Sequence, residues 1–220
     1  MSDGVNGLQR FAVIGTSCSG KTTFARALAQ SLCVSHIHLD ELYWGPDWTP
    51  RPLEGVRRRL DAATAQPRWV CDGNYSSLRD LIWPRAEAVI WLNYPLRTVM
   101  SRAIRRTVRR VWTREPLYAG SRETFRRSFL SRDSILLWAL QTHERHRSEY
   151  PRLLATPEHA HLKVFELQDA VITDACLRFL QCQRSFRASA HEAAGKTSYD
   201  SNHECPQEIE WMVRTLDFRL

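Results

Sequence analysis

The stretch that decides the fold covers residues 11–24 and reads FAVIGTSCSGKTTF. Its first four residues are an apolar run that predicts a buried strand of a parallel sheet. The next eight, residues 15–22, match the pattern G-x-x-x-x-G-K-[ST] in full. Phe24, Leu28 and Leu32 then recur every four residues, which predicts a helix with one buried stripe. A strand, a glycine-containing loop and a helix in this order predict a phosphate-binding loop.

Each part of this loop has a chemical reason. Glycines allow the backbone to aim successive N–H groups at one anion, and the N-terminus of the following helix adds its positive end. Lys21 is expected to reach the outer phosphates, and the Thr22 hydroxyl is expected to coordinate Mg²⁺. The sequence therefore predicts that the loop binds ATP with Mg²⁺. The residues expected to hold the nucleotide are Gly15, Ser17, Cys18, Ser19, Gly20, Lys21, Thr22 and Thr23.

The rest of the chain alternates apolar runs with amphipathic stretches. Strands are predicted at 34–39, 69–71, 88–92 and 162–167, and helices at 53–65, 95–110, 123–150 and 170–180. A Trp- and Pro-rich loop is predicted at 43–52. This alternation predicts an α/β fold with a parallel sheet covered on both faces. One domain is expected over 1–182, with a largely mobile tail at 183–220 that contains one short helix near its end.

Two aspartates fall at the ends of predicted strands. In open parallel sheets ligands bind beyond the carboxyl ends of the strands, so both are expected at the site. Asp72 follows three apolar residues and is predicted to hold Mg²⁺ directly or through water, together with Thr22. Asp40 is predicted to orient either Mg²⁺ or the hydroxyl of an acceptor, and Glu41 is a weaker substitute. The alternative for each aspartate is a helix cap or a turn residue.

Arginines concentrate in residues 97–132, a segment that contains eleven arginines and only two acidic residues. This local excess of nine positive charges is larger than the net charge of +7 of the whole chain. Arg102, Arg106 and Arg109, with Arg122 next, are predicted to stabilise the charge that develops in phosphoryl transfer, and a lid is predicted at about 107–122. A solvated charged face is the alternative for some of them. Contact with nucleic acid is less favoured, because no DNA-reading motif accompanies the charge.

Paired histidines and clustered aromatics leave alternatives open. His36 and His38 lie on one face of a predicted strand, and His143 and His146 have helical spacing. No carboxylate or cysteine joins them at the spacing of a metal motif, so packing or surface roles are favoured over metal ligation. The aromatic residues that follow Asp40 are expected either to pack under a loop or to wall an acceptor pocket; they are Tyr43, Trp44 and Trp48.

The remaining composition excludes several classes of protein. No stretch approaches the roughly 20 apolar residues of a membrane span, and residues 1–9 lack the apolar run of a signal peptide. None of the six cysteines forms a Cys-x-x-Cys pair, so neither a zinc site nor a thioredoxin-like motif is expected, and a disulfide framework is not expected either. A soluble cytoplasmic protein without membrane partners, monomeric or homodimeric, is expected.

Several motifs together resemble a known family. They are LDELYWGPDW at 39–48, WVCDGNYS at 69–76, WLNYPLR at 91–97, and Arg102 followed by Arg105-Arg106-Thr107. From about residue 11 to 180 this series resembles the adenylate-kinase-like proteins known as DNA topology modulation proteins. The resemblance implies a nucleoside monophosphate kinase core, with three α/β/α layers, a five-stranded parallel sheet of order 2-3-1-4-5 and a short arginine-rich lid. It also implies that Arg102 and Arg106 grip phosphates.

Departures from adenylate kinases argue against AMP as the acceptor. Asp72-Gly73 is followed by Asn74-Tyr75 in place of Phe-Pro-Arg, and residues 43–48 replace the loop that holds AMP.

The sequence leaves three hypotheses for the function. The first is a nucleotide or small-molecule kinase that uses Asp40 to position an unidentified acceptor. The second is an ATP-dependent regulator that binds DNA or a protein through its arginines, and the third is a nucleotide-binding structural protein. A GTPase is not favoured, because the Asn-Lys-x-Asp guanine-reading element is missing.

Overall fold

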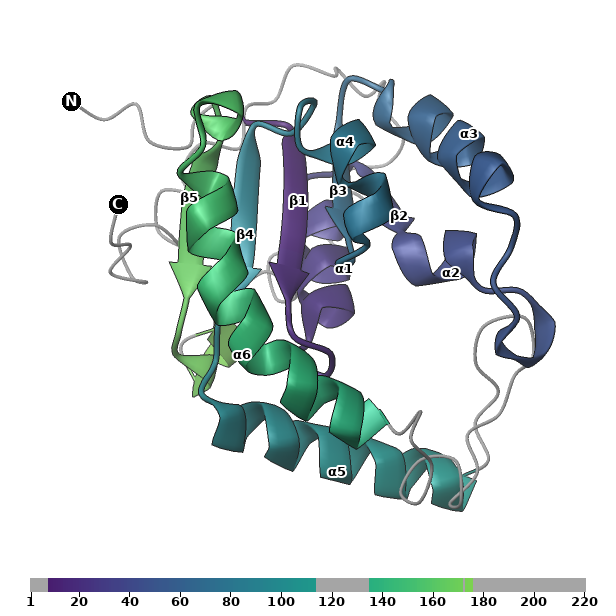
Figure 1. Cartoon of the computed structure of the whole chain (residues 1–220), viewed down its shortest axis with the longest axis vertical. Helices are drawn as coiled ribbons and strands as arrows, with labels where there is room; N and C mark the ends of the chain where they lie inside the picture. Colours follow the sequence, from purple (N-terminus) through teal and green to yellow (C-terminus); the bar gives the residue numbers. More distant parts are fainter. Residues whose placement is uncertain (1–7, 114–134, 172, 176–220) are drawn as a thin grey trace, which may run out of the picture.

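A computed structural model describes residues 8–113, 135–171 and 173–175 of the chain (Figure 1). Its centre is one sheet of five strands in the order β2-β3-β1-β4-β5, and every strand pair is parallel. The strands are β1 Arg10–Gly15, β2 Ser35–His38, β3 Trp69–Asp72, β4 Ala88–Leu92 and β5 Lys163–Leu167. This arrangement confirms the predicted fold class and the predicted order 2-3-1-4-5.

Helices cover both faces of the sheet. The α-helices are α1 Lys21–Ser31, α2 Leu39–Tyr43, α3 Leu53–Thr64, α4 Arg79–Ile82, α5 Leu96–Thr113 and α6 Ile135–Leu154. The 3-10 helices are η1 Pro46–Trp48, η2 Ser76–Leu78 and η5 Pro157–His159. In the described residues, every helix is too short or too polar to cross a lipid bilayer.

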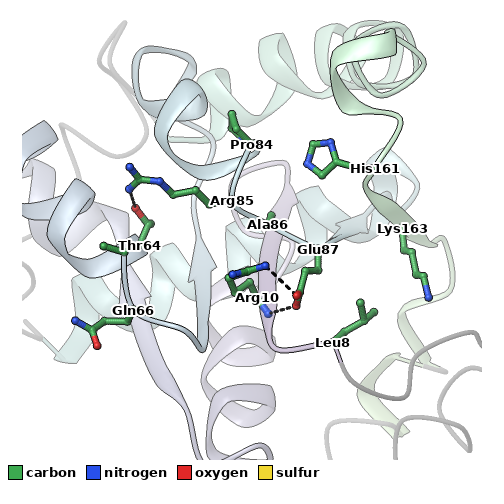
Figure 2. A pocket seen from close by; sticks show the side chains of 11 residues that line it. Leu8, Arg10, Thr64, Gln66, Pro84, Arg85, Ala86, Glu87, His161 and Lys163 are labelled. Carbon is green, nitrogen blue, oxygen red and sulfur yellow. Dashed lines mark hydrogen bonds and ion pairs between the residues drawn. The ribbon is translucent and has the colours of Figure 1, made fainter.

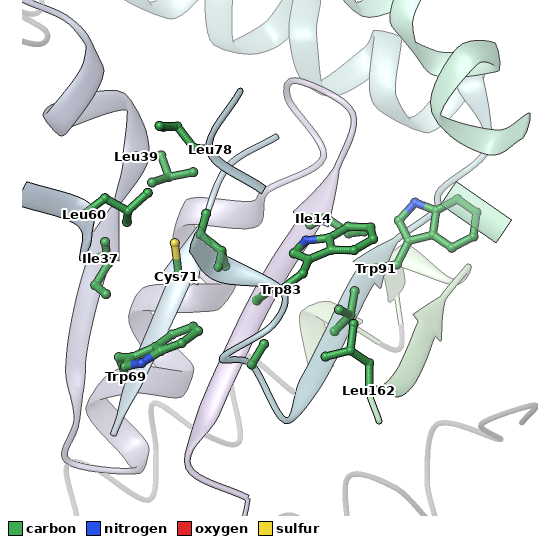
Figure 3. Close-up of a cluster of buried hydrophobic side chains, with 14 of the residues drawn as sticks. Ile14, Ile37, Leu39, Leu60, Trp69, Cys71, Leu78, Trp83, Trp91 and Leu162 are labelled. Carbon is green, nitrogen blue, oxygen red and sulfur yellow. The ribbon is translucent and has the colours of Figure 1, made fainter. Parts of the chain in front are cut away.

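The core consists of two layers, one on each face of the sheet. Side chains alternate between the faces of a strand, so Phe11 and Val13 of β1 enter one cluster, and Ala12 and Ile14 enter the other. The first cluster contains Phe24 of α1 and also Leu28, as the helical stripe predicts. The second contains residues from the segments that cover the opposite face, among them Leu60, Leu78 and Trp83 (Figure 3). Because both layers are needed to bury β1, the strand that carries the phosphate loop is fixed from both sides.

The segment after β2 differs from the prediction. The strand ends at His38, and Leu39 already begins α2, so Asp40 lies in the first turn of a short helix and not at the end of a strand. An acidic residue is favourable there because the N-terminal end of a helix is positive. The predicted loop at 43–52 is also wrong in part, because it contains η1. The elements η2 and α4 were not predicted, since three or four residues are too few to show a helical period.

Two helices extend further than predicted. Helix α5 ends at Thr113, and α6 continues through Pro151 to Leu154, past the predicted end at Tyr150. A proline so close to the helix end removes one backbone hydrogen bond without stopping the helix. Residues 123–134 of the predicted helix, the lid beyond 113, most of the 170–180 helix and the tail at 183–220 lie outside the described residues.

Candidate active site

The phosphate loop connects the carboxyl end of β1 to the N-terminus of α1. Gly20 precedes α1 with a φ of 97°, in the left-handed region that glycine adopts without strain. A Cβ added at Gly20 would lie 3.3 Å from Arg102 Nη1, so this position is also tightly surrounded. Ser19 is fully buried, and its Oγ has no hydrogen-bond partner in the part of the chain that the structure describes. A buried hydroxyl without a partner in the middle of the loop is consistent with a loop shaped around a polar ligand.

Lys21 lies where several of the predicted site residues converge. Its Nζ donates a hydrogen bond of 3.1 Å to the carbonyl of Thr16. Burial lowers the pKa of Lys21, while the negative charges of Asp40 and Asp72 act in the opposite direction, and Arg106 lowers it further. The structure therefore brings together Lys21, both predicted aspartates and one of the predicted arginines, although they come from four separate segments.

Thr22 and Asp72 are in direct contact. The Thr22 hydroxyl donates a hydrogen bond of 2.6 Å to Asp72 Oδ2, and Asp72 is 2 % exposed. Burial raises the pKa of Asp72, but the hydrogen bond from His36, the charge of His38 and the hydrogen bond from Thr22 together bring it below the ordinary value of 3.8. Asp72 is therefore a buried carboxylate that stays ionised at neutral pH.

These two side chains fit the predicted Mg²⁺. A hydroxyl and an ionised carboxylate are the hard oxygen donors that Mg²⁺ prefers, and Mg²⁺ at nucleotide sites takes only one or two carboxylates besides phosphate oxygens. In the described segments, no group of three or more His, Cys, Asp or Glu side chains is arranged to hold a metal.

Two histidines of β2 belong to this site, in contrast to the packing or surface roles that were favoured. His36 Nε2 donates a hydrogen bond of 2.8 Å to Asp72 Oδ1. His38 Nε2 lies 3.3 Å from Thr22 Oγ1, and His38 Nδ1 lies 3.0 Å from Glu41 Oε1. The two rings are stacked, with centroids 5.7 Å apart. The sequence showed only that both histidines share one face of a strand that ends next to Asp40. Their contact with the Asp72 carboxylate follows from the register in which His38 of β2 pairs with Asp72 of β3.

Asp40 lies beside a group of aromatic rings. The Tyr75 hydroxyl donates a hydrogen bond of 2.6 Å to Asp40 Oδ1, and burial and this carboxylate raise the pKa of Tyr75. The Tyr43 ring packs on the Tyr75 ring with centroids 4.5 Å apart. Trp44 meets Tyr43 edge-on at 5.0 Å, and Trp48 meets Trp44 at 5.8 Å. All four rings are half-buried, so they remain available to wall a pocket next to Asp40.

The residues after Asp72-Gly73 support the site, a role that the sequence did not indicate. Asn74 Oδ1 accepts a hydrogen bond of 3.2 Å from the backbone N–H of Gly15, and Asn74 Nδ2 donates to the carbonyl of Gly15. A Cβ at Gly73 would lie 2.8 Å from Leu39 Cβ, and Gly73 has a φ of 140°. The segment that replaces Phe-Pro-Arg thus fixes the start of the phosphate loop through Asn74, while Tyr75 contacts Asp40.

The predicted arginines take different places on α5. Arg102 donates a hydrogen bond of 2.9 Å to the carbonyl of Ser19, pairs with Asp174 at 2.7 Å and lies 5.0 Å over the Tyr94 ring. Through these contacts Arg102 connects α5 to the phosphate loop. Arg106 is half-buried, and its Nε has no hydrogen-bond partner among the described residues. Arg109 is exposed on the next turn, and Arg122 lies outside the described residues. A direct role of any of them on phosphate stays a prediction.

A cavity of about 570 Å³ lies at the end of the sheet opposite the phosphate loop (Figure 2). Its lining includes the Arg10–Glu87 ion pair at the start of β1, as well as His161 and Lys163 near the start of β5. These are the amino ends of the strands, whereas ligands of open parallel sheets bind at the carboxyl ends. None of the predicted site residues lines this cavity, so we place the candidate active site at the phosphate loop.

Comparisons with known proteins find similar solved structures but no family. The sequence matches no protein-family model and no curated protein. Among solved structures, a gluconokinase from Sinorhizobium meliloti 1021 is similar over 87% of this chain and 100% of that chain, at 15% identity and a TM-score of 0.45. Shikimate kinase from Acinetobacter baumannii is similar over 85% of this chain and 99% of that chain, at 18% identity and a TM-score of 0.47.

A sugar kinase from Janibacter sp. HTCC2649 is similar over 83% of this chain and 93% of that chain, at 15% identity and a TM-score of 0.38. None of these three is a DNA topology modulation protein, so that more specific assignment stays a prediction. At such identities the similarity concerns the fold alone. Each TM-score is below 0.5, so the similarity supports nothing further about this chain.

Proposed function

We propose that this protein is a P-loop phosphotransferase that moves the γ-phosphoryl group of ATP to a hydroxyl group of a small acceptor molecule, with Mg²⁺. The observation that supports it best is one edge of the sheet on which Lys21, the Thr22–Asp72 pair and the Asp40–Tyr75 pair converge. A phosphate-binding loop alone serves many functions. A second carboxylate beside the loop, flanked by aromatic rings, adds a place for an acceptor.

Each side chain has a distinct task in this proposal. Thr22 and Asp72 would hold Mg²⁺, which neutralises phosphate charge when it is bound. Lys21 and Arg106 stabilise the negative charge that develops on the moving phosphoryl group. Asp40 accepts a hydrogen bond from the acceptor hydroxyl, and Tyr75 keeps the carboxylate in one orientation. Positioning and charge stabilisation supply most of the catalysis in this class of reaction, so no strongly basic group is required.

An ATP-dependent regulator is the second candidate, and the surface of α5 favours it. Arg97 and Arg105 are exposed on this helix, so α5 offers positive charge to an anionic partner such as DNA. In that case duplex DNA would bind in a salt-sensitive manner that survives loss of Lys21. The resemblance to DNA topology modulation proteins does not favour this alternative, since that family name describes an effect and nothing in the site itself selects nucleic acid.

The decisive experiment measures ATP consumption with Mg²⁺ across a panel of acceptors. The panel contains nucleoside monophosphates, nucleosides and hydroxylated metabolites, including sugars and shikimate. Lys21→Ala serves as the blank, and Lys163→Ala, at the opposite edge of the sheet, is the matched control that should keep full activity. A rise in turnover with one acceptor, lost in Lys21→Ala alone, supports the proposal. Tight ATP binding with a flat profile would favour the regulator, and full turnover in Lys21→Ala would contradict the site assignment.

A further inference from the structure

His36 is a histidine of β2 that no step of the proposed function uses. It pairs with Val70 of β3, and Val70 belongs to the apolar cluster on the face of the sheet that contains Phe24 and Leu28 of α1. Val34, two residues earlier on the same face, packs against this cluster. His36 has only 17 % of its side chain exposed. A polar ring in such surroundings costs free energy unless it is hydrogen-bonded, so the partner of His36 is informative.

The partner of His36 is the carboxylate of Asp72. His36 Nε2 donates a hydrogen bond of 2.8 Å to Oδ1, and the Thr22 hydroxyl donates one of 2.6 Å to Oδ2. A carboxylate rotates easily about its terminal torsion, so one donor on each oxygen fixes which of the two oxygens faces Thr22. Because Asp72 is 2 % exposed, water is a poor substitute for either donor. His36 therefore decides the orientation of Asp72.

The ring of His36 is itself held in place by its neighbours. It stacks on the ring of His38, with centroids 5.7 Å apart and planes 17° apart. His38 Nδ1 in turn lies 3.0 Å from Glu41 Oε1. Strand β2 pairs with β3, and α1 contacts both strands from one face of the sheet (Figure 1). The hydrogen bond to Asp72 thus starts from a ring whose position is set by strand pairing and stacking.

We propose that His36 is a positioning residue of the metal site, and that its Nε2–H holds Oδ1 of Asp72 so that Oδ2 stays turned toward Thr22 and available to Mg²⁺. This inference rests on the proposed function, because it assumes that Thr22 and Asp72 hold Mg²⁺. Hydrogen bonds from outside the ligand set change metal affinity by about 10–100-fold when they are removed. The effect is indirect, so nucleotide binding without metal should not depend on His36.

The test measures the affinity for AMP-PNP, a non-hydrolysable ATP analogue, by isothermal titration calorimetry in EDTA and at several Mg²⁺ concentrations. His36→Phe keeps a ring for stacking on His38 and removes the donor. We expect the Mg²⁺ concentration for half of the full effect on affinity to rise about tenfold, with the affinity in EDTA unchanged. His36→Gln should recover most of the response, because its amide N–H reaches the place of Nε2. His36→Asn is the matched variant and should not, because its shorter amide resembles Nδ1.

His161→Phe is the control for removal of a histidine elsewhere. His161 Nε2 contacts the carbonyl of Trp83 at 3.2 Å, and His161 lines the cavity at the end of the sheet opposite the phosphate loop. This variant should keep the wild-type response to Mg²⁺. An unchanged response in His36→Phe, or an equal loss of affinity with Mg²⁺ and in EDTA, would overturn the inference and make His36 a packing residue.

Failure of the proposed function gives a different result in the same experiment. A wild-type protein whose affinity for AMP-PNP does not respond to Mg²⁺ would overturn the metal site of the proposed function together with this inference. A wild-type protein that responds to Mg²⁺, with His36 variants that respond equally, would overturn this inference alone. The two failures are therefore distinguishable.

Discussion

The hydroxyl of Thr22 and the carboxylate of Asp72 are 2.6 Å apart, although 50 residues separate them in the chain. The contact joins the first turn of α1 to the last residue of β3. It exists because β3 lies directly beside β1, so both strands end at the same edge of the sheet. These two oxygen atoms are the pair that we propose to hold Mg²⁺.

Replacement of Asp72 by Asn should separate metal binding from folding. The amide keeps the size of the side chain but loses its charge, so kcat should fall about a hundredfold and the Mg²⁺ concentration for half-maximal activity should rise. Steady-state kinetics at several Mg²⁺ concentrations would measure both effects. Asp80→Asn is the control, because Asp80 is a surface carboxylate paired with Arg57. Equal activity in Asp72→Asn and Asp80→Asn would remove Asp72 from the metal site.

Arg106 and Arg105 are neighbours on α5 with different surroundings. Arg106 is half-buried and its charge acts on Lys21, whereas Arg105 is exposed. We expect Arg106→Ala to lower kcat about tenfold or more while ATP affinity changes little, because its charge is needed mainly in the transition state. Arg105→Ala should change neither quantity. If both variants keep the wild-type rate, Arg106 belongs to the solvated face of the helix.

Tyr75→Phe should loosen Asp40 without removing it. The substitution deletes the hydroxyl that donates to Asp40 Oδ1 and keeps the ring that packs on Tyr43. A lost hydrogen bond of about 1 kcal/mol predicts roughly a fivefold lower kcat/KM for the acceptor, with the KM for ATP unchanged. The measurement is a pair of titrations, one in each substrate. An effect confined to ATP would place Tyr75 on the nucleotide side of the site.

The buried imidazole of His146 predicts a loss of stability in acid. Folding lowers its pKa from the ordinary 6.5 to about 4, so between these pH values the unfolded chain binds a proton that the folded chain does not. The free energy of unfolding therefore decreases as the pH falls through this range, by at most about 3 kcal/mol from this group. Urea denaturation at several pH values should show a smaller acid loss in His146→Phe than in the wild type. Parallel curves for the two proteins would contradict the low pKa.

Local sequence was sufficient for the elements with a strong pattern. The apolar runs gave the strands close to their observed bounds, and the glycine-lysine motif placed the phosphate loop between β1 and α1. Asp72 was predicted as a site residue because it follows three apolar residues, and strand ends are where an open sheet binds its ligands. The spacing of the arginines placed Arg102 and Arg106 on one helix, but it did not predict the contact of Arg102 with Ser19.

The amino-acid sequence by itself thus determined the fold class and the phosphate loop, because a buried strand and a glycine-containing turn are set by residues adjacent in the chain. Only the tertiary structure decided which side chains surround that loop. His36 and Tyr75 come from β2 and the β3–η2 connection, and they contact Asp72 and Asp40 through the packing of segments that are distant in the chain. Such contacts depend on how the strands pair across the sheet, and a local pattern of residues does not specify that pairing.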